Sequence, residues 1–422
     1  MLDIKFIREN LEVVKAGAAQ KRFEVDLDLI VNLDDERRGL IKEVEELKAR
    51  RNKASDEVAQ LKKAGQNADA TITEMRSVGD QIKSMDDRLK SLEQQLQKAL
   101  LTVPNVPHPS TPEGSTPAEN VSIASWGEAP KTDFKLKPHW EIAEKLKLID
   151  FATGTKIAGS GFPVYIGAGA RLQRALINFF LEEGRNRGYT EVMPPIVVNA
   201  ESATGTGQLP DKEDQMYVVT RDEFYLIPTA EVPVTNMHRE SVIKAEQLPI
   251  KYCAYTPCFR REAGSYGKDV RGLNRLHQFD KVELVKFVHP ETSYEELESL
   301  RSDAEHLLQL LKLPYRVLLM CRGDMGFTQT KKYDLEVWSA GQERWLEVSS
   351  CSNFEAFQAR RMNIKFKDGS GKPEFLHTLN GSGLALPRIV SAILENYQTD
   401  EGTVLVPSAL RSYMGMDVIK SA

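Results

Sequence analysis

The first quarter of the chain carries a hydrophobic repeat that is typical of coiled coils. Within residues 29–103, apolar positions recur at alternating steps of four and three in two separate stretches. This spacing has a period of 3.5 residues and predicts two helices that pack along a narrow seam. The predicted seam residues are Leu40, Val44, Leu47, Arg51, Ala54, Val58 and Leu61, followed by Val78, Ile82, Met85, Leu89, Leu92 and Leu96.

A polar break separates the two predicted helices. The segment KKAGQNADA, which contains Gly65 and Asn67, lies between them, and the first proline after residue 29 is Pro104. Two helices joined by a short break predict an antiparallel hairpin. At 1.5 Å per residue, about 34 residues in each helix give an arm roughly 50 Å long.

Basic residues are concentrated toward the far half of this arm. A solvated coiled-coil face would explain them, but a long arm with a basic tip also suits the phosphate backbone of a nucleic acid. The net charge of the chain is −5, so any nucleic-acid contact must come from such a local cluster. The candidate residues are Lys48, Arg50, Arg51, Lys53, Lys62 and Lys63.

The pattern divides the chain into an N-terminal domain at 1–103, a linker at 104–120 and a second domain at 121–422. The linker is rich in proline. The second domain mixes helical and β-rich stretches without regular β–α–β spacing, which favours an antiparallel α+β fold. Its helices are expected at 171–187, 291–313 and 388–397, and its strands at 189–198, 223–228, 280–288, 315–320 and 344–350.

Composition narrows the class of protein. Of the 422 residues, 28% are charged and 41% hydrophobic, which is ordinary for a soluble protein. No apolar run reaches the ~20 residues of a membrane span, and the N-terminus has no apolar signal core, so a cytoplasmic protein is expected. The four cysteines lack the spacing of a zinc site, so no zinc is expected.

Two segments carry candidate chemistry for ATP, although the chain has no P-loop and no dinucleotide-binding glycine motif. In 258–285, Arg260 can bind a phosphate, Glu262 can accept from an amine, and Phe279 can stack on a base. A surface hairpin would explain this segment equally well. In 379–388, glycines would allow a backbone or ligand to approach closely, just before Arg388 at the start of a helix. A glycine-rich turn before a packed helix would explain this segment equally well.

Together these segments resemble the three ordered motifs of class II aminoacyl-tRNA synthetases. Motif 2 resembles 258–285, through Phe259-Arg260-Arg261-Glu262 and the run from Arg275 to Phe279. Motif 1 resembles 171–198 with Pro195, and motif 3 resembles 379–397 with Arg388. The strings FRREAGSYGKDVRGL, HQFDKVEL, PTAEVP and TLNGSGLALPR, like the helical hairpin, are similar to the seryl-tRNA synthetase family. The chain departs from the general class pattern at Ala385 and Pro387, which puts the local geometry near Arg388 in question.

The resemblance implies activation of L-serine with ATP and its transfer to the 3′ end of serine tRNA. It leaves open whether selenocysteine tRNA is also charged. The implied catalytic residues are Arg260 and Arg388, and Mg²⁺ would be held by Glu347 and Ser350, although Asp334 or Glu336 could compete on chemistry alone. The implied ATP-binding residues are Arg260, Arg261, Glu262, Phe279, Glu347, Val348, Ser349, Ser350 and Arg388.

The resemblance also implies a serine pocket, a homodimer and a role for the arm. Glu283 and Ser382 would face the serine hydroxyl, and Thr229, Ala230 and Glu231 would face its amino group. The carboxylate of serine is ionised at neutral pH and attacks ATP directly, so no histidine, cysteine or serine nucleophile is expected and His277 is interpreted as structural. Motif 1 would form a two-fold interface, and the basic arm would bind tRNA.

Two other functions fit parts of the sequence. A class II relative that loads an amino acid onto a carrier protein would lack the long arm, whereas residues 29–103 are intact. A non-catalytic coiled-coil paralogue would be expected to have lost active-site residues. The residues that such a loss would affect are all present, namely Arg260, Glu262, Glu283, Glu347 and Arg388.

Overall fold

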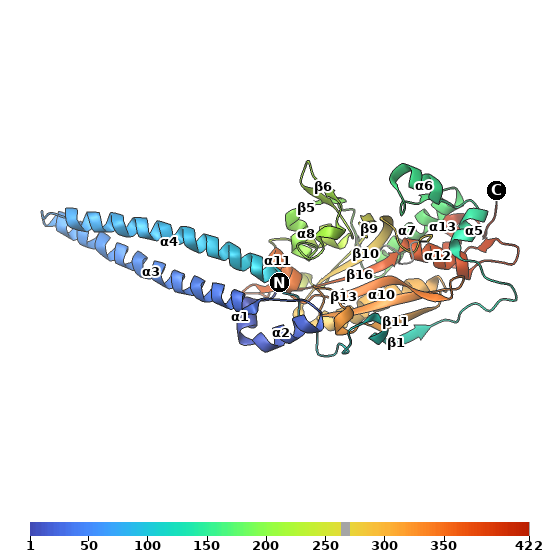
Figure 1. The fold of residues 1–422 in the computed structure, drawn as a ribbon, viewed down its shortest axis with the longest axis horizontal. Coiled ribbons are helices and arrows are strands. Elements are labelled where there is room, and N and C mark those ends of the chain that lie inside the picture. Colours follow the sequence, from blue (N-terminus) through green and yellow to red (C-terminus); the bar gives the residue numbers. More distant parts are fainter. Residues whose placement is uncertain (263–270, 422) are drawn as a thin grey trace. The chain divides into compact units, whose positions relative to one another are not determined.

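The computed structural model describes residues 1–262 and 271–421, which form two compact units (Figure 1). One unit contains residues 1–19 and 23–104, and the other contains 20–22 and 105–422. The glycine-rich part of the predicted motif 2, residues 263–270, lies outside the described residues. Among the described helices, none is both long enough and apolar enough to cross a membrane.

The first unit is dominated by a helical hairpin. After the short helices α1 (Ile4–Glu9) and α2 (Leu11–Gln20), helices α3 (Leu27–Lys63) and α4 (Asp69–Leu101) run side by side (Figure 1). Every predicted seam residue is buried or half-buried, whereas most residues between them are exposed. In the turn, Gly65 has a φ of +70°, a conformation that glycine adopts without strain. The predicted coiled-coil hairpin is therefore confirmed.

The second unit is built on an eight-stranded sheet with the order β1-β11-β12-β13-β16-β10-β9-β4. All neighbouring strands in it are antiparallel except β4 and β9, so the predicted α+β class is confirmed. In sheet order the strands are β1 (Val121–Trp126), β11 (Tyr315–Leu319), β12 (Lys331–Ser339), β13 (Arg344–Asn353), β16 (His377–Ala385), β10 (Gln278–Val288), β9 (Ile250–Phe259) and β4 (Thr190–Glu191).

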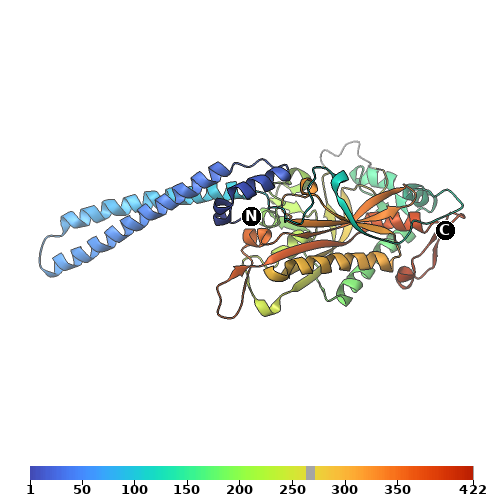
Figure 2. The same cartoon turned by 90° about the horizontal axis from the view of Figure 1, so that it is seen from below.

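Three helices share the main hydrophobic core with this sheet, namely α7 (Ala168–Asn186), α10 (Ser293–Leu310) and α12 (Leu386–Asn396). Figure 2 shows α10 lying along the sheet. Val282 and Leu284 of β10 point into this core. Because side chains alternate along a strand, Lys281 and Glu283 point to the opposite face. The alternation thus leaves polar side chains on the face away from the three helices.

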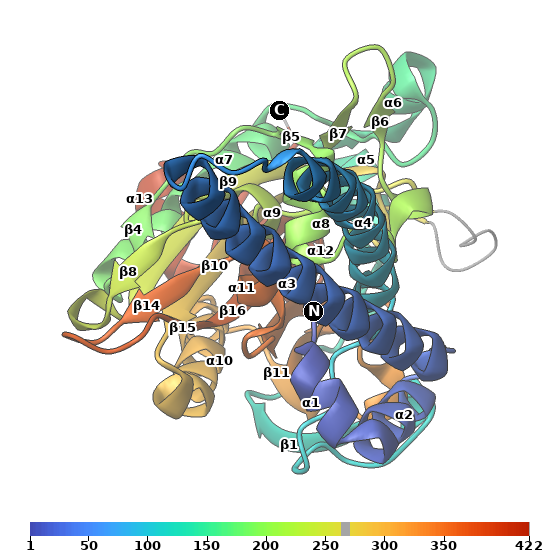
Figure 3. The same ribbon diagram turned by 90° about the vertical axis from the view of Figure 1, so that its left-hand side faces the viewer.

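Shorter elements complete the second unit. Figure 3 shows β8, β14 and β15 as a small sheet of their own. The short helices are α5 (His139–Lys145), α6 (Phe151–Ala158), α8 (Ala200–Thr206), α9 (Glu231–Asn236), α11 (Phe357–Met362) and α13 (Arg411–Met414). The short strands are β2 (Ile149–Asp150), β3 (Val164–Tyr165), β5 (Val197–Asn199), β6 (Val218–Val219), β7 (Phe224–Leu226), β8 (Val242–Lys244), β14 (Lys365–Lys367), β15 (Glu374–Phe375), β17 (Val404–Leu405) and β18 (Val418–Ile419).

The strand predicted at 189–198 is in fact two short strands in different sheets. β4 pairs with β9, whereas β5 pairs with β7. Between them, Pro194 and Pro195 have no N–H to donate to a neighbouring strand. The proline that marks motif 1 therefore also divides the segment between the two sheets.

The glycines at 381 and 383 allow a close approach, as expected from the sequence, but of neighbouring side chains. They lie within β16, a nine-residue strand, and face the hydrophobic core instead of a ligand. A Cβ atom at Gly381 would lie 3.0 Å from the Cys351 Sγ, and one at Gly383 would lie 3.1 Å from Leu284. The small residues thus let β16 pack closely against its neighbours, while Ser382 between them points the other way.

The proline-rich segment after the arm is anchored to the second unit. The Asn105 amide nitrogen donates to the carbonyl oxygens of Thr328 at 3.0 Å and Phe354 at 2.9 Å. The backbone N–H of His108 donates to the Thr330 carbonyl. The segment then leads into β1 at the edge of the main sheet.

Candidate active site

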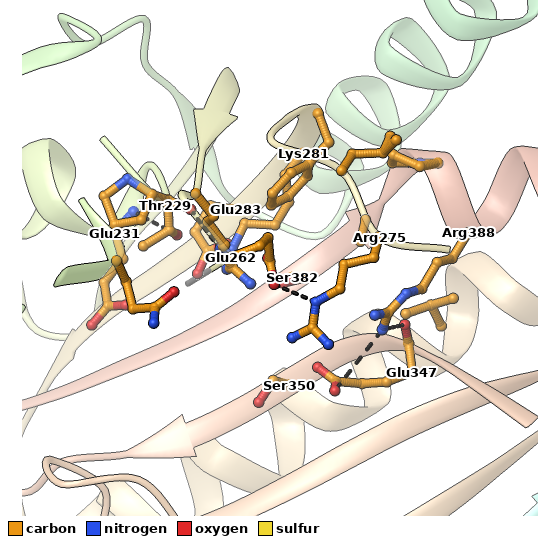
Figure 4. A pocket seen from close by; sticks show the side chains of 18 of the residues that line it. Thr229, Glu231, Glu262, Arg275, Lys281, Glu283, Glu347, Ser350, Ser382 and Arg388 are labelled. Atoms are coloured by element: carbon orange, nitrogen blue, oxygen red, sulfur yellow. Dashed lines mark hydrogen bonds and ion pairs between the residues drawn. The ribbon is translucent and has the colours of Figure 1, made fainter. Parts of the chain in front are cut away.

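A cavity of about 460 Å³ opens on the polar side of the main sheet (Figure 4). Its walls come from β10, β13 and β16, from the first turn of α12, and from segments around residues 212, 229 and 274. Most of the residues predicted from the sequence line it. They are Thr229, Glu231, Arg260, Glu262, Phe279, Glu283, Glu347, Val348, Ser350, Ser382 and Arg388.

The register of β10 and β16 brings two of the predicted serine-binding residues together. Glu283 and Ser382 are directly opposite each other across the two antiparallel strands, and both line the cavity. Residues in this relation have Cβ atoms about 4.5–5.5 Å apart. Two residues that are 99 positions apart in the chain thus form one wall of the site.

Two buried glutamates define one end of the cavity. Glu231 is 7% exposed and Glu283 is 1% exposed. The amide nitrogen of Asn380 donates to both carboxylates, at 2.9 Å in each case. The Lys281 Nζ lies 2.7 Å from Glu283, and the Gln358 amide donates to Glu231 at 2.6 Å. The two carboxylates are therefore held by a shared network of donors.

This burial changes the acidity of Glu231. Removal from water, reinforced by the nearby charge of Glu283, raises the pKa of Glu231 to about 7. The hydrogen bond from Gln358 acts in the opposite direction but is weaker. A cation placed next to Glu231 would favour its ionised form, so this end of the cavity suits a small molecule that carries an ammonium group.

Arginines gather at the other end of the cavity (Figure 4). The Arg260 guanidinium lies over the Phe279 ring, 5.1 Å from its centre, and Arg275 forms an ion pair with Glu262. Arg388 donates to the Glu347 carbonyl at 2.6 Å. Guanidinium groups bind phosphate oxygens in a bidentate manner, so this end suits a polyphosphate.

The candidate metal ligands differ in their surroundings. Glu347 is partly exposed and lines the cavity with Ser350. Although burial opposes it, the charges of Lys332, Arg388 and Arg260 hold the pKa of Glu347 below its usual value. An ionised carboxylate and a hydroxyl are hard oxygen donors of the kind that Mg²⁺ prefers. These two residues therefore fit the metal that the sequence suggested.

The two competing carboxylates each pair with a basic side chain. Asp334 is buried beside Lys332, at 3.2 Å, and burial raises its pKa to about 7. Glu336 accepts a hydrogen bond from Arg316 at 2.6 Å. Within the described chain neither side chain lines the cavity.

Three residues that were predicted to bind ATP or serine are not among the described residues that line the cavity. His277 does not line it either. The Ser349 hydroxyl donates to the Ser382 carbonyl at 2.6 Å, and the Arg261 guanidinium donates to the Asp214 carbonyl. Ala230 is buried in a separate hydrophobic cluster. His277 contacts the Tyr217 hydroxyl at 2.9 Å and stacks on Phe162, which agrees with its structural interpretation.

Sequence reasoning missed three polar residues of the buried network, namely Lys281, Asn380 and Gln358. Lys281 and Asn380 each precede a predicted residue by two positions, on the strands that carry Glu283 and Ser382. Because strands repeat every two residues, that spacing was a signal that they share the same face. Gln358 lies on the short helix α11 and carried no comparable signal.

The basic residues of the arm are not all equivalent. Lys48 forms an ion pair with Asp86 at 3.4 Å, and Arg50 forms one with Glu74. Arg51 is half-buried at its predicted seam position, whereas Lys53, Lys62 and Lys63 are exposed. Exposed ion pairs contribute little to stability, so even the paired residues remain able to exchange partners.

Family models match both parts of the chain. The seryl-tRNA synthetase N-terminal domain matches residues 1–107, and the tRNA synthetase class II core domain (G, H, P, S and T) matches residues 217–397. A serine–tRNA ligase from Geobacter sulfurreducens is 56% identical over 98% of this chain and 99% of its own length. Another, from Thermodesulfovibrio yellowstonii, is 54% identical over the full length of both chains.

Solved structures agree with these matches. The crystal structure of a seryl-tRNA synthetase from Pyrococcus horikoshii complexed with ATP superposes with a TM-score of 0.93 at 37% identity, covering all of both chains. The cytoplasmic serine–tRNA ligase from Naegleria fowleri in complex with AMP gives a TM-score of 0.89 at 29% identity, covering 100% of this chain and 99% of the other.

The buried pair of Lys281 and Glu283 predicts a specific pattern of stability. Lys281→Met leaves a buried carboxylate without its cation, so we expect the free energy of unfolding to fall by about 3–5 kcal/mol. Adding Glu283→Gln to the same chain should recover much of this loss, because the unpaired charge is then removed. Urea denaturation of both variants measures the difference, and an equal loss in the two would contradict the pairing.

Proposed function

The chain belongs to the seryl-tRNA synthetase family, and we propose that the cavity of its second unit is where serine and ATP react. The enzyme activates L-serine with ATP to give seryl-adenylate and transfers the seryl group to tRNA. The observation that supports this location is the pairing of Glu283 with Ser382, beside Glu231 at one end and facing Arg260 and Arg388 at the other.

In the first step, the serine carboxylate attacks the α-phosphorus of ATP, and pyrophosphate leaves. Serine is already ionised at its carboxyl group, so no general base is required. Arg260 would contact the α-phosphate and Arg388 the γ-phosphate, where fixed positive charge stabilises the charge that develops on the oxygens. Glu262 would accept from the adenine amino group, and Phe279 would stack on the ring.

Glu347 and Ser350 would hold Mg²⁺ together with the phosphates of ATP. When bound, the metal would neutralise charge on the leaving pyrophosphate. In the second step, the terminal 3′-hydroxyl of the tRNA attacks the seryl carbonyl of the adenylate and AMP leaves. The adenylate phosphate can accept the hydroxyl proton.

Serine would be selected at the glutamate end of the cavity. Glu283 and Ser382 would bond the serine hydroxyl, and Glu231 with Thr229 would bind its ammonium group. Alanine and glycine would leave the polar groups of Glu283 and Ser382 without the partner that the serine hydroxyl would supply. Such a site rejects analogues that lack the hydroxyl more strongly than a hydrophobic pocket could.

Replacement of Glu283 should therefore damage selectivity more than ATP binding. We expect Glu283→Ala to lower the serine-to-alanine ratio of kcat/KM in pyrophosphate exchange by roughly 100-fold, with a smaller change in the KM for ATP. Glu296→Ala removes another glutamate that pairs with a buried lysine, Lys286, and serves as the control. An unchanged ratio in Glu283→Ala would contradict the assignment.

The raised pKa of Glu231 predicts that serine binding depends on pH. The ionised form attracts the ammonium group, and with a pKa of about 7 the ionised fraction falls from about nine-tenths at pH 8 to about one-tenth at pH 6. We expect the KM for serine to rise up to about tenfold as the pH falls over this range. Pyrophosphate exchange at several pH values measures this.

Glu231→Gln provides the control for this pH dependence. Because the amide does not titrate in this range, the variant should have a high KM for serine that changes little between pH 6 and pH 8. If the wild-type KM for serine were flat while that for ATP varied, the ammonium site would not be at Glu231.

The two parts of the chain would have different roles, with residues 1–103 binding tRNA, 104–120 connecting and 121–422 catalysing. The arm would lie against the tRNA and recognise its backbone and shape, which suits Lys53, Lys62 and Lys63 as phosphate contacts. Recognition by shape would also allow selenocysteine tRNA as a second substrate. Both reactions would take place in the cytoplasm.

Deletion of residues 35–97 should separate the two half-reactions. The hairpin packs on its own seam, so its removal should leave pyrophosphate exchange largely unchanged while efficient tRNA charging is lost. Neutralising Arg50, Arg51 and Lys53 should weaken charging less and should reduce the salt dependence of tRNA binding. Loss of exchange together with charging would show that the arm belongs to the folding core, and full charging would exclude it from tRNA binding.

A homodimer is also proposed, through the motif 1 segment at 171–198. Residues next to its prolines are unusually exposed for apolar side chains, with Met193 at 88% and Ile196 at 37%. Two-fold interfaces bury the same surface on both subunits, so this strip would pack on its own copy. Light scattering should give twice the mass of one chain, and a stable monomer at micromolar concentration would contradict the proposal.

A further inference from the structure

A buried histidine and glutamate lie behind the proposed ATP site, outside the described wall of the cavity. His139 is the first residue of α5, and Glu395 is near the end of α12. Both side chains are fully buried, and the His139 Nδ1 is 2.8 Å from a carboxylate oxygen of Glu395. Neither residue has a part in the reaction described above, so their burial calls for another explanation.

The Glu395 carboxylate is surrounded by hydrogen-bond donors. The backbone N–H of His139 donates at 2.9 Å, and the Gln342 amide and the Gly341 N–H each donate at 3.0 Å. The Ser339 hydroxyl also donates to it. Although burial opposes ionisation, the bonds from His139 and Ser339 hold the pKa of Glu395 below its usual value. Glu395 is therefore an ionised anchor.

This anchor fixes the orientation of the His139 ring. The Nε2 atom of His139 accepts a hydrogen bond from the backbone N–H of Leu273 at 2.8 Å. A nitrogen that accepts carries no proton, so the proton of the neutral ring is on Nδ1 and points to Glu395. The imidazole thus connects a fixed carboxylate to one backbone N–H of the motif 2 segment.

The backbone beside Leu273 fits closely against His139. Gly272 has a φ of +66°, and a Cβ atom built on it would lie 2.2 Å from the His139 Nε2. Only glycine leaves room for this approach. The close fit accompanies the Leu273 hydrogen bond and indicates that the ring and this stretch of backbone are matched in shape.

A second connection reaches the neighbouring residue. The Gln342 amide donates to Glu395, and its carbonyl oxygen accepts from the Asn274 amide at 2.9 Å. The Asn274 backbone carbonyl in turn accepts from the Arg388 Nε at 3.4 Å. Leu273, Asn274 and Arg388 all line the cavity. Both connections from Glu395 therefore end on the wall that faces the proposed phosphates.

We propose that His139 is a positioning residue for ATP, which holds the 272–274 backbone in place and thereby fixes Arg388. This inference rests on the ATP site proposed above. It predicts a selective effect, because Glu231 and Glu283, which are proposed to bind serine, are held by a different network. Loss of the Leu273 bond should weaken ATP use while serine use is largely retained.

Two substitutions of His139 separate positioning from simple packing. An asparagine amide lies at the Nδ1 position and can still bond Glu395, but it does not reach Leu273. A glutamine carbonyl extends to the Nε2 position and can accept from Leu273. We expect His139→Asn to raise the KM for ATP about tenfold in pyrophosphate exchange, with less than a twofold change for serine. His139→Gln should remain within about threefold of the wild type for both substrates.

Further variants protect the test against misfolding. Gln342→Met removes the second connection at a half-buried site and should raise the KM for ATP by about threefold. His238→Asn is the control. The His238 ring makes a comparable hydrogen bond, 3.0 Å long, to the Tyr252 hydroxyl, and neither residue is among those that line the cavity. Thermal melting of every variant is measured in parallel.

The outcomes are distinct. Any of three results would overturn the positioning role. The KM for ATP could be equal in His139→Asn and His139→Gln, or His139→Asn could affect ATP and serine equally. The KM for ATP could also be unchanged in Gln342→Met. Arg388→Ala tests the underlying site separately. If it leaves ATP use unchanged, the proposed ATP site is wrong. If it abolishes exchange while His139→Asn has no effect, the site stands and only the role of His139 is refuted.

Discussion

Two buried carboxylates impose the strictest constraint on the second unit. Glu231 and Glu283 are both less than a tenth exposed, and an ionised group in such a place is tolerated only with partners in fixed positions. Asn380 supplies a donor to both, from the strand next to Glu283. A shift of one residue between β10 and β16 would turn Glu283 into the core and Leu284 into the cavity. The site therefore depends on the register of this one pair of strands.

The register also determines where the charges of opposite sign lie. Lys281 neutralises Glu283 at the acidic end, whereas Arg275 and Arg388 lie at the other (Figure 4). At the buried acidic end, charges interact more strongly than in solution. This separation of charge suits an ammonium group at one end and a polyphosphate at the other, without the glycine-rich phosphate loop that many ATP-binding proteins use.

How much of this could be predicted from the sequence varied with the type of pattern. The arm was predicted residue by residue, because a heptad repeat depends only on local spacing. The strand β16 was not, because Gly381 and Gly383 are typical of turns and only tertiary packing against Leu300 and Leu284 requires them in a strand. The split of 189–198 between two sheets also depends on partners that are distant in sequence.

The same distinction holds for the cavity. Motif spacing identified Arg260, Glu283 and Arg388, but the donors that make buried charge tolerable come from elsewhere in the chain. Gln358 lies on a short helix and His139 lies 134 residues before its partner Leu273. Such contacts have no local signature, so a single sequence does not contain a pattern that predicts them.

Helix α12 shows how these distant contacts are combined. It is eleven residues long, and apart from Arg388 and Asn396 its residues are buried, so it is expected to move as one body. Arg388 in its first turn faces the cavity, and Glu395 in its last turn anchors His139 and Gln342. Those two residues hold the backbone that Arg388 also contacts. The position of Arg388 therefore depends on both ends of α12. The first turn carries Arg388 itself, and the last turn carries Glu395, which acts through His139 and Gln342 on the motif 2 backbone that Arg388 contacts.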